Sequence, residues 1–149
     1  MLKKNIITLS LILFLANCGF TSIYVQNKNI NFSIEQIEYT GDRDFNNFLK
    51  INLDRYKNEK DNNKIFLNVD SKYKKSILSK DSTGKITSYR IEIEVIFTVK
   101  STNKKIRISE KKIIDSRDDK FEETRYEKSI KQSFSYSISS KLISELIIN

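Results

Sequence analysis

The chain has one cysteine, Cys18, and its position indicates a covalent modification. Lys3 and Lys4 stand near the start, a short apolar run from Ile6 to Ala16 follows, and Cys18 comes two residues later. A positive start, a short apolar stretch and then a cysteine are typical of a bacterial lipoprotein signal peptide. We therefore predict export, cleavage before Cys18, and attachment of acyl chains to that cysteine, which would tie the chain to a membrane.

Other interpretations explain less of this segment. The apolar run is too short for a membrane-spanning helix, which needs about 20 residues, and two lysines do not usually precede a buried helix. Asn17 departs from the small residue that commonly precedes a lipidated cysteine, which leaves the efficiency of cleavage open. Gly19 replaces the Asp that signals retention in the inner membrane of many lipoproteins, so we expect transfer to the outer membrane, on its periplasmic side.

The remaining composition argues against catalysis. The chain has no histidine, which removes the commonest general base and the commonest metal ligand. The glycines stand apart, so there is no glycine-rich phosphate loop, and Glu92 and Glu94 share the solvated side of a predicted strand. We predict a protein that is not an enzyme and holds no cofactor or metal. The formal net charge of +8 does not indicate a nucleic-acid partner, because an exported protein would not meet one.

Basic residues near two predicted turns form the candidate binding site. The four residues are Lys80, Lys85, Arg117 and Lys120. Successive turns of an antiparallel meander lie at alternate ends of the sheet, so we expect all four at one end. Clustered cations can bind an anion, such as the phosphates of a lipid headgroup. Alternatively, they are ordinary solvated residues of a lysine-rich chain, because neighbouring carboxylates weaken the positive field. These carboxylates belong to Asp81, Asp118 and Asp119.

Apolar periodicity predicts the elements that would position these residues. Alternation indicates strands, and apolar residues three or four apart indicate helices. The predicted strands cover 32–39, 64–78, 86–100 and 105–114; the predicted helices cover 42–57 and a segment capped by Asp118. We expect an α+β two-layer sandwich of order β-α-β-β-β-α, with two helices packed on one face of a four-stranded, mostly antiparallel sheet. Residues 1–17 would be the signal peptide, 18–31 an acylated tether and 32–149 one domain.

The start of the predicted mature chain resembles a known family. Its sequence Cys18-Gly19-Phe20-Thr21-Ser22-Ile23-Tyr24 is similar to the Cys-Gly-Phe-x-Pro-Leu-Tyr start of the LPS-assembly lipoproteins of the LptE family. Ser22 and Ile23 depart from that pattern. The size of the mature chain and the order of its elements also match the family.

The resemblance implies an outer-membrane lipoprotein that acts as plug and assembly partner of the LptD β-barrel and helps to deliver lipopolysaccharide to the outer leaflet. Some members bind lipopolysaccharide through basic residues at one end of the domain. Only Cys18 is carried over residue by residue. The alternative is a stand-alone periplasmic lipoprotein that binds lipid or cell wall without a barrel partner.

Overall fold

The computed structural model describes residues 31–57 and 63–148. Cys18, the predicted signal peptide and all but the last residue of the predicted tether lie outside the described residues. No helix of the described part is both long enough and apolar enough to cross a membrane.

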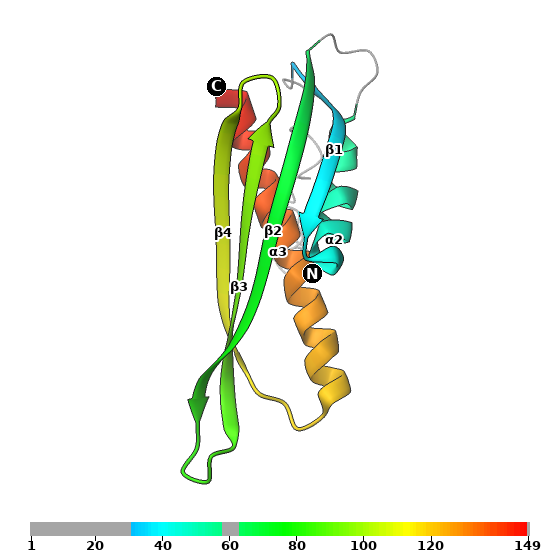
Figure 1. The fold of residues 1–149 in the computed structure, drawn as a ribbon. Helices are drawn as coiled ribbons and strands as arrows, with labels where there is room; N and C mark the ends of the chain where they lie inside the picture. Colours follow the sequence, from blue (N-terminus) through cyan, green and yellow to red (C-terminus); the bar gives the residue numbers. More distant parts are fainter. Residues whose placement is uncertain (1–30, 58–62, 149) are drawn as a thin grey trace, which may run out of the picture.

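The sheet has four strands in the order β1-β2-β3-β4 (Figure 1). The strands are β1 (Ser33–Gly41), β2 (Lys64–Lys80), β3 (Ile86–Val99) and β4 (Lys104–Asp115). β1 pairs in parallel with β2, and the other two pairs are antiparallel. The parallel pair needs a crossover, which α2 (Arg43–Leu53) and a short 3₁₀ turn, η2 (Asp54–Tyr56), provide.

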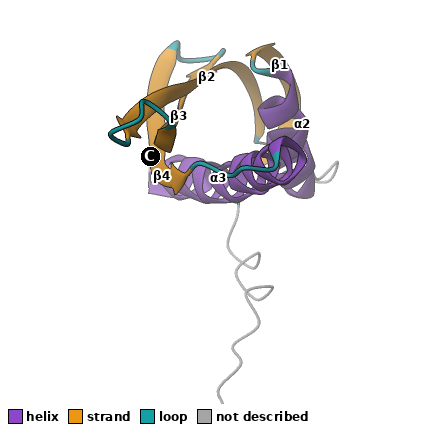
Figure 2. Cartoon of the chain, turned by 90° about the horizontal axis from the view of Figure 1, so that it is seen from below, coloured by secondary structure: helices purple, strands orange, loops and turns teal. Residues whose placement is uncertain are grey.

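The helix α3 (Lys120–Ile148) follows β4, so the element order is the predicted β-α-β-β-β-α. Seen along its length, the sheet curls, and both helices lie on its inner side (Figure 2). The predicted fold class is therefore confirmed. The β1–β2 register has an irregularity between Ile34 and Gln36.

The core lies between the inner face of the sheet and the helices. On β3, every second residue from Ile91 to Val99 is buried. On α3, apolar residues four apart are buried against this row; they are Ile130, Phe134, Ile138 and Leu142. On α2 the buried apolar residues are Phe45, Leu49 and Leu53, again four apart. The period of four places them on one helix face, which explains why this segment is helical and where it packs.

The junction between β1 and α2 depends on two residues. Asp42 caps the helix, since its side chain accepts a hydrogen bond of 2.8 Å from the Phe45 amide. Gly41 has φ +94°, and a Cβ built on it would lie 1.8 Å from the carbonyl oxygen of Ser71 on β2. A residue with a side chain does not fit here, because β2 runs directly beside the turn.

One predicted cap is wrong. Asp119, rather than Asp118, caps α3 by accepting hydrogen bonds from the amides of Phe121 (2.7 Å) and Glu122 (3.4 Å). Asp118 instead forms an ion pair with Lys85 across the end of the sheet. Asp119 directly precedes the first helical residue, whereas Asp118 is engaged by Lys85.

Gly41→Ala tests the β1–α2 junction. We expect it to lower the free energy of unfolding by about 2–4 kcal/mol, because both the positive φ and the contact with β2 oppose a Cβ. Gly84→Ala is the matched control, since Gly84 has φ +86° but open space around it; it should cost about 1 kcal/mol. Chemical denaturation followed by circular dichroism measures both, and equal losses would contradict the steric argument.

Candidate functional site

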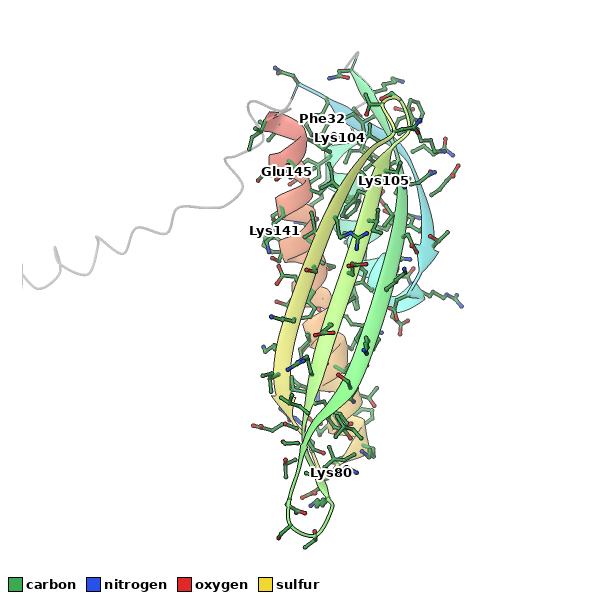
Figure 3. All side chains as sticks on the ribbon, turned by 60° about the vertical axis from the view of Figure 1, so that its left-hand side comes forward. Phe32, Lys80, Lys104, Lys105, Lys141 and Glu145 are labelled. Carbon is green, nitrogen blue, oxygen red and sulfur yellow. The ribbon has the colours of Figure 1, made fainter. Side chains whose placement is uncertain are left out.

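The predicted basic residues lie at one end of the sheet, which we call the basic end. The β2–β3 turn meets the β4–α3 junction there, and Lys85 Nζ lies 2.6 Å from Asp118 Oδ1. Lys80 closes β2 at the same end, where it pairs in register with Ile86, and it lies beside the hairpin tip (Figure 3). The alternation of turns in a meander, which could be derived from the sequence, brings these residues together.

Three of the four basic side chains are already engaged. Lys85 pairs with Asp118, and Lys120 Nζ lies 3.6 Å from Glu123 Oε1. The guanidinium of Arg117 stacks on the ring of Tyr126, 4.5 Å from its centroid. Within the described residues, Lys80 forms no ion pair. The cation–π contact leaves the Arg117 N–H groups able to donate, so Lys80 and Arg117 are the cations most open to an anionic ligand.

Hydrogen bonds fix the charges and the shape of the β2–β3 turn. Asp81 accepts hydrogen bonds from the Thr83 hydroxyl (2.7 Å) and from the amides of Thr83 (2.9 Å) and Lys85 (3.0 Å). The bond from the Thr83 hydroxyl is the main reason that the pKa of Asp81 is lowered. The ion pair between Asp118 and Lys85 lowers the pKa of Asp118 and raises the pKa of Lys85. Both partners therefore remain charged, and Asp118 offsets part of the positive field of this end.

Exposed apolar side chains accompany the cations. Ile77 and Leu78 at the end of β2 are 52% and 39% exposed, and Phe121 at the start of α3 is 71% exposed. The sequence reasoning did not single them out. Apolar groups beside cations match a ligand that carries both phosphates and acyl chains.

A partly buried ionic network, absent from our sequence predictions, attaches the start of α3 to β2. Lys75 Nζ lies 2.9 Å from carboxylate oxygens of both Glu123 and Glu127. Tyr73 donates its hydroxyl to Glu127, and Lys131 lies over the Tyr73 ring, 4.0 Å from its centroid. Glu123 is only 5% exposed, and it also accepts hydrogen bonds from the Arg117 amide and the Ser116 hydroxyl.

The network also reaches α2 and shifts the pKa values of its members. Lys131 Nζ lies 3.1 Å from Asp42 Oδ2, so the cap of α2 is tied to α3. The hydrogen bond from Lys75 lowers the pKa of Glu123 although burial opposes this. Burial by itself would lower the pKa of Lys75, but its bonds to Glu123 and Glu127 raise the pKa overall. The sequence did hold a signal, because Glu123, Glu127 and Lys131 are four residues apart.

The open face of the sheet carries rows of alternating charge. A hollow of about 580 Å³ lies over β2, β3 and β4 and is lined mainly by charged side chains. In register, Lys72 lies opposite Glu94 and Lys74 opposite Glu92, while Lys111 flanks Glu92 from the other side. Glu94 also binds Arg107, with 3.1 Å between Oε2 and Nη1. In the part of the chain that the structure describes, no three metal-ligating side chains come together.

No protein-family model and no curated protein matches this sequence. Among solved structures, the rare lipoprotein B from Shewanella oneidensis has a similar fold, with a TM-score of 0.54 and 11% identity, over 75% of this chain and 93% of that chain. The minor lipoprotein from Acinetobacter baumannii matches with a TM-score of 0.51 and 15% identity, over 74% of this chain and 93% of that chain. At such low identity, the likeness is one of fold.

Glu123→Gln tests the ionic network. It should lower the free energy of unfolding at pH 7 by about 1–3 kcal/mol, because Lys75 loses a charged partner. Since the pKa of Glu123 is lowered in the folded state, its contribution is complete above about pH 4.3, the ordinary glutamate pKa, and is lost as the pH falls through the lower folded value. The difference between wild type and variant should therefore shrink at pH 3.

Denaturation curves at both pH values measure this effect. Glu122→Gln is the control, because Glu122 lies next in sequence, its side chain is 44% exposed, and among the described residues its ion pair is with Arg125, at 3.6 Å. It should change stability little. A loss for Glu123→Gln that is the same at pH 3 and pH 7 would contradict the assigned charge.

Proposed function

We propose that the chain is an acylated outer-membrane lipoprotein of the LptE family. It acts, without catalysis, as plug and assembly partner of an LptD-like β-barrel, and its basic end binds lipopolysaccharide. The observation that carries the proposal is the sequence from Cys18 to Tyr24, in which the predicted lipidation cysteine opens the family-like motif two residues after the apolar run. The fold and the charged open face of the sheet are compatible with the proposal.

The fold supports the proposal at a coarser level. The chain shares its architecture with two solved bacterial lipoproteins and covers 93% of each of those chains. Lipoproteins are thus a known use of this fold. Because fold alone does not determine function, the barrel partner and the lipid rest on the N-terminal motif and on the surface chemistry.

The first described residues and the basic end lie at opposite ends of the domain, which supports a separation of the proposed anchor from the proposed lipid site. The described chain enters the sheet at Phe32, at the end opposite Lys80 (Figure 3). An anchor on Cys18 precedes Phe32 in the chain, so a domain held by its start presents the basic end away from the anchored leaflet. A lipid bound there would be one in transit rather than a headgroup of the leaflet that holds the anchor.

The open face of the sheet suits a barrel interior. The lumen of a large outer-membrane barrel is polar and hydrated, and this face offers lysines of β2 beside glutamates of β3. These residues are Lys72, Lys74, Glu92 and Glu94. Such a face can exchange hydrogen bonds with a polar wall without burying an apolar patch.

Affinity isolation tests the barrel partnership. The full chain with a C-terminal tag, extracted from membranes in mild detergent, should bring a large outer-membrane β-barrel with it. Lys72→Glu combined with Lys74→Glu should reduce that recovery, because the substitutions reverse the lysine row of the open face. Lys50→Glu with Lys128→Glu is the control, since it makes the same charge change on exposed helix positions. Recovery of the wild-type chain as a free monomer would favour the stand-alone lipoprotein instead.

Charge removal at the basic end tests lipid binding. Lys80→Gln, Lys85→Gln and Arg117→Gln together should weaken binding to lipopolysaccharide tenfold or more, because each basic residue near an anionic lipid surface is worth about 1 kcal/mol. The control is the same change at the other end, in Lys64, Lys104 and Lys105. Binding to lipopolysaccharide micelles is measured by titration at fixed ionic strength. Equal affinities of the two triple variants would remove the proposed site.

A further inference from the structure

The free edge of β4 is the feature of this fold that the proposed function leaves unused. In the described sheet, β4 pairs with β3 alone, so its other edge has no neighbouring strand. Every second residue of an edge strand points its backbone N–H and C=O outward. The β3–β4 register runs without a shift from Ser88–Asp115 to Val99–Lys104, whereas both other strand pairs contain irregularities. Twelve residues of β4 therefore form a regular template for another strand.

Basic side chains line this edge on the open face. Lys105, Arg107 and Lys111 alternate along β4, and all three are exposed. Arg107 already binds Glu94. Among the described residues, the ammonium groups of Lys105 and Lys111 have no ion pair. An added strand would place its own side chains about 5 Å from this row, so alternate acidic residues would complement it.

A groove follows the same edge on the inner face. It holds about 470 Å³ between β4 and the second half of α3. Its lining joins four consecutive residues of β4, from Ile106 through Arg107 and Ile108 to Ser109, with Ser140, Lys141, Ser144 and Glu145 of α3. Figure 3 shows Lys141 and Glu145 on the helix beside this strand. Small side chains of an added strand fit a groove lined by serines, whereas bulky ones do not.

Contacts between α3 and β4 fix the width of the groove. Lys141 Nζ lies 2.5 Å from Glu110 Oε1, and the Ser137 hydroxyl donates to the same oxygen at 2.6 Å. Glu110 is thus held from the helix side, and Lys141 also lowers its pKa although burial opposes this. The backbone edge, the basic row and the groove are therefore parts of one continuous surface.

We propose that the β4 edge binds an extended acidic peptide segment of another protein as a fifth strand. The segment carries acidic residues at every second position, facing Lys105, Arg107 and Lys111, with small uncharged residues between them that enter the groove. Backbone hydrogen bonds supply affinity, and the charge row supplies specificity. A second copy of β4 is a poor occupant, because directly opposed like charges destabilise a strand pair. The proposal is independent of a barrel partner and of lipid binding.

The test uses synthetic peptides and the full chain in mild detergent. The probe is a ten-residue peptide of alternating Glu and Thr with a fluorescent label, and binding is followed by anisotropy. We expect binding that saturates and that a Lys-Thr peptide of equal length does not show. The Glu-Thr peptide methylated on its backbone nitrogens keeps its charge but cannot donate backbone hydrogen bonds to β4. It should therefore bind at least tenfold more weakly. Equal binding of the methylated and unmethylated peptides would overturn the proposal.

Variants of the chain locate the binding site. Lys105→Glu with Lys111→Glu should weaken binding of the Glu-Thr peptide at least tenfold. The matched control, Lys50→Glu with Lys128→Glu, makes the same charge change on exposed positions of α2 and α3 and should leave the affinity within twofold. Equal loss in both variants would mean general attraction and overturn the proposal. If the full chain forms oligomers and the variant Lys105→Glu with Lys111→Glu dissociates them, another copy of the chain binds the β4 edge. That result would also overturn the proposal.

Discussion

The attachment of one long helix to one face of the sheet organises this molecule. α3 runs along the inner face and uses two kinds of contact. Its second half packs apolar residues such as Phe134 and Ile138 against the buried row of β3. Its first half binds β2 through charges, with Glu123 and Glu127 sharing Lys75. Lys131 then links α3 to the cap of α2 through Asp42. Both helices, the crossover and the basic end are therefore positioned by contacts along α3.

The ionic half of this contact sets geometry more than stability. Removing charges from water is costly, and a buried ion pair often returns little net free energy. The network mainly fixes geometry. Glu123 also accepts a hydrogen bond from the Arg117 amide and so positions the residues that lead into α3. The Lys85–Asp118 pair spans the same region, but both side chains are exposed and such pairs contribute little. The position of Arg117 and Lys120 thus depends mainly on a buried glutamate that is not part of the predicted anion site.

Periodicity along the sequence was sufficient to predict the elements and their order, since alternation and fourfold spacing report which face is buried. It also placed the four basic residues at one end, because the turns of a meander alternate. Periodicity could not tell Asp118 from Asp119 as a cap, or show that Lys85 and Lys120 have acidic partners. Those contacts depend on how elements distant in sequence are aligned. The network around Glu123 was missed for the same reason, although its residues are spaced for one helix face.

In the proposed function, a lipid anchor before Phe32 holds a domain whose basic, partly apolar end lies on the far side. Its central claim is that Cys18 carries the anchor, since the family resemblance and the orientation both begin there. Mass spectrometry of the chain purified from the membrane fraction tests this claim most directly. The account predicts an N-terminal peptide that begins at Cys18 and carries acyl chains. A chain that retains residues 1–17 with an unmodified Cys18 would contradict it.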